Sequence, residues 1–166
     1  TQIYKPLPEE EDEEKPDNDV HSVAFNLGGP ILQDRLWFFT SFQLSHQTTE
    51  TLVPAEVQRP EPMQSETWVS QYLFGKLTFT PQANHRIWVQ AQADPTNIDN
   101  AARDIYTLEN AETWWQQGGW LASAGHQWTP SANTIVDTQL ATSSNYIRVT
   151  PMQWQGCNEY DENRWC

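Results

Sequence analysis

The sequence lacks the features that mark several large classes of protein. Its 166 residues contain no run of 18 or more apolar residues, so the sequence predicts no membrane-spanning helix. Basic residues are scarce, with 9 Lys and Arg against 22 Asp and Glu and a formal net charge of −13. Because phosphate contacts depend on Lys and Arg, this balance disfavours nucleic acid as a partner.

Patterns typical of catalysis or cofactor binding are missing as well. No Ser-His-Asp order, glycine-rich phosphate loop or paired-carboxylate motif stands out. The histidines are dispersed along the chain, without i, i+4 pairs or neighbouring cysteines: His21, His46, His85 and His126. The glycine pair at 118–119 fits relief of crowding in a strand better than a phosphate cradle. We therefore expect no enzyme activity, no metal and no cofactor.

Cysteine is limited to two residues near the end, Cys157 and Cys166, in "CNEYDENRWC". A zinc site needs three or four ligands, and no second Cys or His pair flanks these two. The pair favours a short local disulfide, which implies an oxidising compartment.

Alternation of apolar and polar residues is what the sequence has in abundance. In 86–94, for example, Ile87, Val89 and Ala91 share one parity, and mostly polar residues occupy the other. Such period-two patterns predict strands with one apolar and one polar face. They recur in six segments: 20–27, 36–47, 68–80, 86–94, 114–128 and 135–147.

A near-repeat separates two pairs of these strands, "TPQANH" at 80–85 and "TPSANT" at 129–134. A repeated segment between apolar runs indicates one supersecondary unit used again, here a β-hairpin. With a first turn predicted at 28–35, three hairpins fit residues 20–147. We expect the turns to depend on glycines, on rigid prolines and on asparagines that tolerate the left-handed conformation: Gly28, Gly29, Pro30, Pro81, Asn84, Pro130 and Asn133.

Acidic residues concentrate outside the predicted strands. Residues 1–19 form an acidic, Pro-rich arm with eight acids and two lysines, and polar loops are predicted at 48–67, 95–113 and 148–166. After residue 19, only Asp34 and Asp137 lie away from these stretches or their edges. Short turns would then lie at one edge of the sheet and long acidic loops at the other. This asymmetry is typical of outer-membrane β-barrels, with short periplasmic turns and long extracellular loops.

Tryptophans near the ends of the predicted strands fit the same interpretation. As girdles at the two membrane interfaces we assign Trp37, Trp68, Trp114, Trp115 and Trp128. The alternative is a secreted, soluble β-sandwich that binds carbohydrate by stacking Trp and Tyr on sugars. The sandwich does not explain why charges are confined to alternate connections.

The predicted fold is therefore all-β: an antiparallel, up-and-down segment of a transmembrane β-barrel. About six strands are too few to close a barrel, since eight is the practical minimum. An open edge in lipid leaves backbone groups unpaired, at high cost. We expect the chain to be a fragment whose missing strands complete the barrel.

Two segments resemble a known family. "NLGGPILQDRLWFFTSFQ" (26–43) resembles the segment just after the plug in TonB-dependent outer-membrane receptors, most of all the Oar-like subgroup. "YLFGKLTFTPQANHRIWVQ" (72–90) resembles the next hairpin of such receptors. Trp37 and Leu32 replace residues that are commoner in the family. The resemblance covers about residues 20–147.

The resemblance implies a receptor or transporter in the outer membrane of a Gram-negative bacterium. Such a protein binds a substrate, here unknown, at external loops and moves it across the membrane with energy from the inner membrane. The implied partners are outer-membrane lipid, the plug and remaining barrel, and a TonB-type coupling protein. The acidic loops would face outside, where they serve solvation or bind ligand or divalent cations.

Overall fold

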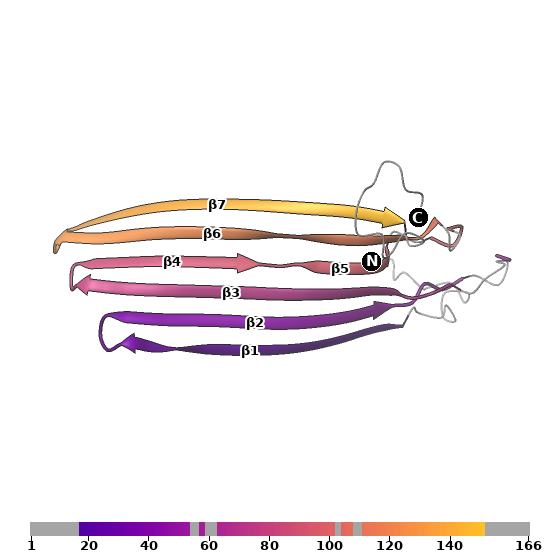
Figure 1. Cartoon of the computed structure of the whole chain (residues 1–166), viewed down its shortest axis with the longest axis horizontal. Coiled ribbons are helices and arrows are strands. Elements are labelled where there is room, and N and C mark those ends of the chain that lie inside the picture. The colour runs from indigo at the N-terminus through magenta and orange to yellow at the C-terminus, as the bar shows by residue number, and fades with distance from the viewer. Residues whose placement is uncertain (1–16, 54–56, 59–62, 102–103, 108–110, 152–166) are drawn as a thin grey trace, which may run out of the picture.

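A computed structural model describes residues 17–53, 57–58, 63–101, 104–107 and 111–151. They form one antiparallel sheet of seven strands (Figure 1): β1 (Asn18–Leu32), β2 (Leu36–Thr49), β3 (Glu66–Gln82), β4 (His85–Ala93), β5 (Thr96–Ala101), β6 (Thr113–Ser131) and β7 (Thr134–Pro151). Within these residues no helix is long and apolar enough to cross a membrane. The prediction of an all-β, antiparallel fold is confirmed.

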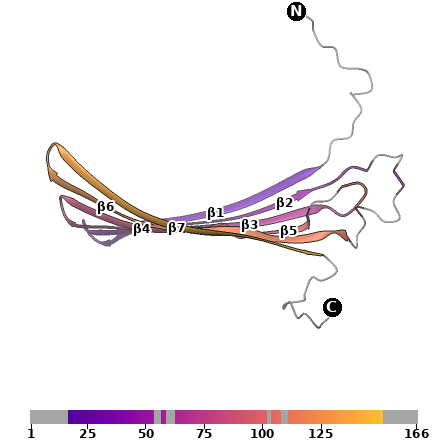
Figure 2. The same cartoon turned by 90° about the horizontal axis from the view of Figure 1, so that it is seen from above.

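Neighbours in the chain are mostly neighbours in the sheet. The order is β1–β2–β3–β4–β6–β7, and β5 lies between β3 and β6 in line with β4. Three short turns gather at one end of the sheet, and the longer connections, the start of β1 and the end of β7 lie at the other (Figure 1). Seen from above, the sheet is twisted and bowed along its strands, as right-handed strand twist requires (Figure 2).

Strand β5 corrects the sequence prediction of a loop over 95–113. Leu73 of β3 pairs with Ala93 of β4, and Ser70 of β3 pairs with Thr96 of β5. Three residue steps separate the two pairs on each side, so the register with β3 is unbroken from β4 to β5. The register with β6 also continues across this gap, from the pair Ala93–Trp120 to the pair Thr96–Gln117, and shifts only later in β5. β4 and β5 thus form one row that is interrupted at Pro95. A proline has no N–H for the ladder and breaks the strand pattern locally.

The first turn is shorter than predicted and occupies only the last part of the range 28–35. Gly28, Gly29 and Pro30 belong to β1 and pair with Phe39, Phe38 and Trp37 of β2. The turn covers residues 33–35, where Asp34 has a φ of 62°. Asp tolerates this left-handed conformation because its short polar side chain can hydrogen-bond locally. Pro30 instead stands beside a bulge near the end of β1, where proline is accepted in a sheet.

Both repeated segments contain a β-bulge, which the alternation of apolar and polar residues did not predict. Phe79 pairs with Ile87 and Gln82 pairs with His85, so β3 uses three residue steps where β4 uses two. The extra residue forms a β-bulge at Thr80–Pro81. The same shift occurs at Thr129–Pro130. Proline fits such bulges because no ladder hydrogen bond is required of it. Each proline is therefore the second-last residue of its strand, and the turns themselves lie at 83–84 and 132–133.

The threonines of the repeat join neighbouring hairpins. The N–H of Thr80 donates to the carbonyl of Arg35 at 2.7 Å, and the N–H of Thr129 donates to the carbonyl of Asn84 at 2.9 Å. Each bond links a hairpin to the turn of the preceding one. Asn84 and Asn133 do lie in the turns, but the left-handed conformation expected for them is absent, since Asp34 and Asn100 are the non-glycine residues with positive φ in the described part.

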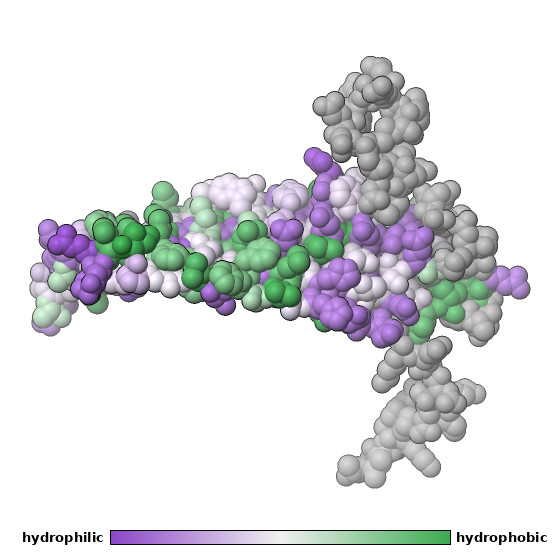
Figure 3. Space-filling model, turned by 60° about the horizontal axis from the view of Figure 1, so that its bottom comes forward, coloured by the Kyte–Doolittle hydropathy of each residue, from purple (hydrophilic) through white to green (hydrophobic). Residues whose placement is uncertain are grey.

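The two faces of the sheet differ in chemistry. We call apolar face the side that carries Phe42, Leu73, Val89, Ala124 and Leu140, and polar face the side that carries Ser45, Ser70, Asp94, Gln117 and Asn145. Alternation along every strand produces this division. In the space-filling view, hydrophobic residues form a band along the middle of the sheet, and hydrophilic residues gather near the long connections (Figure 3).

The sheet has almost no core of its own. In the described part of the chain, Ile98 and Ala101 of β5 are the buried apolar residues, whereas Val23 is 70% exposed and Leu140 is 77% exposed. The described residues form this one sheet and no second layer against it. A β-sandwich, the alternative fold, requires two sheets packed face to face.

Candidate functional site on the polar face

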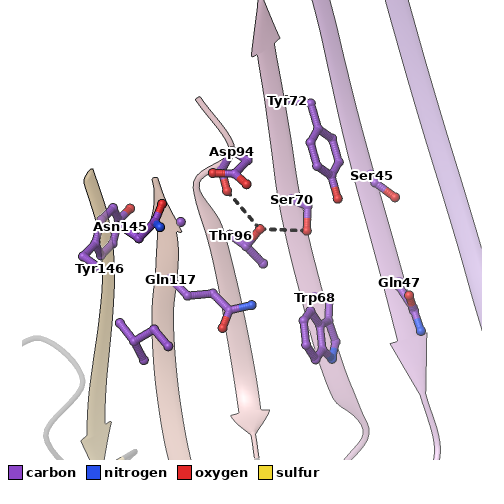
Figure 4. A pocket seen from close by; sticks show the side chains of 12 residues that line it. Ser45, Gln47, Trp68, Ser70, Tyr72, Asp94, Thr96, Gln117, Asn145 and Tyr146 are labelled. Carbon is purple, nitrogen blue, oxygen red and sulfur yellow. Dashed lines mark hydrogen bonds between the residues drawn. The ribbon is translucent and has the colours of Figure 1, made fainter. Parts of the chain in front are cut away.

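A hollow opens on the polar face near the end of the sheet that bears the long connections. Its volume is about 560 Å³, and it is surrounded by residues of β2, β3, β5, β6 and β7 together with Asp94, which lies between β4 and β5. Figure 4 shows the side chains side by side on adjacent strands. The hollow is lined by Ser45, Gln47, Trp68, Ser70, Tyr72, Asp94, Thr96, Gln117, Gly118, Asn145, Tyr146 and Ile147.

Aromatic side chains of β3 provide the apolar part of the hollow. Trp68 and Tyr72 point to the same side of the strand because four residues separate them (Figure 4). The indole N–H of Trp68 donates to the carboxylate of Glu66, so the ring is oriented and its polar edge is satisfied. Such rings offer flat apolar surfaces at low cost in conformational entropy.

The break between β4 and β5 positions the carboxylate of the site. Asp94 accepts a hydrogen bond from the N–H of Gly119 through Oδ1 at 2.7 Å. Gly118 has a φ of 152°, and a Cβ there would lie 2.8 Å from the Cα of Pro95. A Cβ on Gly119 would overlap the side chain of Asn145. The prediction that this glycine pair relieves crowding is therefore confirmed.

Two buried side-chain hydroxyls lie beside Asp94 at the floor of the hollow. Thr96 donates to the hydroxyl of Ser70 at 3.0 Å and lies 3.4 Å from the carbonyl of Asp94 (Figure 4). Ser70 is 9% exposed and Thr96 is 8% exposed. Because the two hydroxyls are hydrogen-bonded and their residues are paired in the sheet, they form a fixed floor of the hollow.

Three polar groups of the hollow have no hydrogen-bond partner among the described residues. Within the described residues, the side-chain amides of Gln117 and Asn145 and the hydroxyl of Tyr72 make no hydrogen bond. Together they offer donors and acceptors to a molecule in the hollow. No Lys, Arg or His is among the lining residues, so Asp94 is the charged group there. The arrangement suits a neutral or cationic molecule with both polar and apolar surfaces.

The tryptophans assigned to membrane girdles divide between the two faces. Trp114 and Trp128 lie on the apolar face, near opposite ends of β6. Trp37, Trp68 and Trp115 lie on the polar face, so the five side chains do not all point to one side of the sheet. Alternation alone predicts this division, since Trp114 and Trp115 are adjacent and must point to opposite sides.

The dispersed histidines are brought together in pairs on the apolar face. His85 Nδ1 lies 2.9 Å from His126 Nε2, and the ring of His85 also stacks on that of Trp128. His21 and His46 are register partners at the other end. Pairing across strands depends on register, which the spacing of histidines in the sequence does not reveal.

Among the described residues, no three His, Cys, Asp or Glu side chains cluster where they could hold a metal ion. The predicted disulfide between Cys157 and Cys166 lies outside the described residues, as do most of the arm 1–19 and most of the loop 148–166. Of that loop, the structure places 148–151 in β7.

A scan of the chain against protein-family models finds no match, and a search among curated proteins finds none either.

Proposed function

We propose that this chain is part of the β-barrel of a TonB-dependent outer-membrane receptor. In this proposal the apolar face contacts lipid, the polar face lines the interior, and the long connections lie outside the cell. The receptor binds a substrate from outside and moves it across the outer membrane with energy supplied through a TonB-type protein. The resemblance of 26–43 and 72–90 to such receptors motivates the family.

One observation carries the proposal: the apolar face is exposed and carries no charge across a membrane-sized band. Between the level of Leu44 and that of Leu36, no Asp, Glu, Lys or Arg occupies this face on any strand. This stretch of β2 is nine residues long, and a membrane-crossing strand needs about 9 to 11. Charged side chains of the strands lie on the polar face or beyond the band, such as Lys76, Arg86 and Arg148.

The exposed apolar side chains are large and numerous. A soluble protein exposes few contiguous apolar patches of this extent, since their burial from water is favourable. Lipid provides that burial without a second protein layer. The exposed apolar residues on this face are Val23, Phe25, Leu27, Phe42, Leu44, Leu73, Leu77, Phe79, Ile87, Val89, Trp120, Trp128, Val136 and Leu140.

The edges of the sheet support a larger barrel. β1 pairs only with β2, and β7 pairs only with β6, in the described part of the chain. Both edge strands are long, with 15 and 18 residues. Because lipid cannot satisfy backbone N–H and C=O groups, a membrane sheet needs further strands to close. The proposal therefore requires such strands from the rest of the protein.

A matched pair of substitutions tests the lipid-facing role of the apolar face. Ala91 and Gln92 are adjacent, exposed residues of β4 on opposite faces. In the complete protein, we expect Ala91→Arg to reduce folding into lipid vesicles strongly, because Arg near the bilayer midplane costs about 2–4 kcal/mol on a lipid face. Gln92→Arg, whose side chain points to the polar face, should fold nearly as well as the unsubstituted chain. The fraction folded is measured by protection from protease after mixing with vesicles.

Equal folding of the two Arg variants would contradict the membrane proposal. The receptor class is tested separately with the complete protein in its own cell. We expect it in the outer-membrane fraction, with gel migration that changes on heating. Recovery in the soluble fraction without detergent would exclude the receptor.

A further inference from the structure

We infer that the hollow on the polar face is a binding subsite for a neutral oligosaccharide. The inference deepens the proposed receptor function by naming its substrate class, and it rests on that function for where the sugar travels. Binding itself depends only on the hollow.

The chemistry of the hollow selects among ligand classes. A sugar ring has apolar C–H faces and a rim of hydroxyls, so it needs flat aromatic surfaces beside groups that both donate and accept hydrogen bonds. Trp68 and Tyr72 provide the aromatic surfaces, and Gln117 and Asn145 provide amides with donors and acceptors. These groups lie on β3, β6 and β7, and the row of β4 and β5 runs between β3 and β6 (Figure 4). A ligand that contacts all of them must therefore extend across four rows of the sheet, as an oligosaccharide can.

The charge of the hollow argues against anionic ligands. The lining includes no Lys, Arg or His, and Asp94 is held in place by Gly119. An anion would meet this carboxylate without a compensating cation. The Oδ2 atom of Asp94 makes no hydrogen bond within the described residues, so it is free to accept one from a sugar hydroxyl. Charge-assisted bonds of this kind are stronger than neutral ones.

The hollow is also preorganised. The indole of Trp68 is held by Glu66, the hydroxyls of Ser70 and Thr96 are bonded to each other, and Asp94 is held by the backbone of β6. A ligand therefore finds these groups already in position, which lowers the cost of binding. At about 560 Å³ the hollow lies within the range of ligand pockets, about 300 to 1,000 Å³.

The experiment titrates the complete folded protein, which contains this chain, with trisaccharides in lauryldimethylamine oxide micelles, because this detergent has no sugar headgroup. Maltotriose, cellotriose and xylotriose are the neutral probes, and trigalacturonate is the anionic probe of similar size. Tryptophan fluorescence and calorimetry report binding. We expect saturable binding of at least one neutral probe and weaker or no binding of trigalacturonate.

Variants assign the binding to the hollow. Trp68→Ala should weaken the affinity for the bound neutral probe about tenfold, which corresponds to the loss of one stacking contact. Trp68→Phe keeps an aromatic face and should retain most of the affinity, which separates lost stacking from lost folding. Trp37→Ala is the matched control, because Trp37 lies on the same face at the other end of the sheet and should bind normally.

The inference is overturned if no neutral probe binds, if trigalacturonate binds at least as tightly, or if Trp68→Ala leaves the affinity unchanged. These results are independent of the Arg substitutions at Ala91 and Gln92. A failure of sugar binding with a folding defect in Ala91→Arg would remove the substrate class and leave the membrane role. Sugar binding without a folding defect in Ala91→Arg would support the subsite and contradict the membrane role on which the receptor proposal depends.

Discussion

Individual glycines of the sheet show how one residue can decide local packing. Gly125 of β6 lies on the polar face directly beside Trp88 of β4, its register partner. A Cβ on Gly125 would overlap the indole ring of Trp88. On β3, the other neighbour of β4, the ammonium of Lys76 lies 5.5 Å from the centroid of the same indole ring. Trp88 thus occupies the space that the missing side chain leaves free, where Lys76 adds a cation–π contact.

The first prediction compares two Gly→Ala substitutions. Gly125→Ala should lower the free energy of unfolding by about 1–3 kcal/mol, because the added methyl forces the indole of Trp88 aside. Gly75→Ala should be neutral or stabilising by up to about 1 kcal/mol, since nothing lies within 4 Å of its Cβ. Urea unfolding in lipid micelles, followed by fluorescence, measures both. Equal stabilities for the two variants would show that Trp88 does not need this space.

The face on which a residue lies can be predicted from sequence, but its neighbours on other strands cannot. The strand parity of Trp68 was readable from the sequence, but its part in a hollow was not. The hollow unites residues from five rows, and their alignment is set by register. Asp94 illustrates the difficulty further, since Gly119, which binds it, lies 25 residues away.

Strands were more predictable than the features that interrupt them. Alternation placed six strands near their observed positions because one face is apolar throughout. It missed β5, where Pro95 breaks the pattern and the polar residues Asn97 and Asp99 occupy the apolar side beyond the uncharged band. It also extended the first turn over 28–35, because Gly28, Gly29 and Pro30 are residue types that favour turns in general. Here the register shows that they pair within β1.

The second prediction concerns the row formed by β4 and β5. Insertion of one alanine between Pro95 and Thr96 should disrupt the pairing of β5, because a slip of one residue turns every side chain to the other face. Ile98, 1% exposed, would lose its buried position. Hydrogen exchange should then show loss of protection over 96–101 and retention over 86–93.

An insertion elsewhere controls for this effect. One alanine added after Leu52, in the connection between β2 and β3, should leave protection of both segments unchanged, because loop length has little effect on stability. Unchanged protection of 96–101 in the Pro95 insertion would mean that β5 does not depend on its continuity with β4.

The described part of the chain forms a single sheet, and most of its exposed large apolar residues lie on one side. The sequence predicted this two-sided character, since alternation and the position of charges are local properties. Whether the sheet meets lipid depends on surroundings that alternation does not encode. The absence of charge from the apolar face between the levels of Leu44 and Leu36 is the feature that favours lipid.

The most direct test of that contact uses spin labels along β4. Each residue from 86 to 93 is replaced in turn by a labelled cysteine, with Cys157 and Cys166 replaced by serine, and the protein is folded into vesicles. Oxygen, which concentrates in lipid, and a water-soluble nickel complex then compete to relax each label. We predict a period of two, with oxygen dominant at Ile87, Val89 and Ala91 and nickel dominant at the even positions. Equal access of the nickel complex to both sets would contradict contact between the apolar face and lipid.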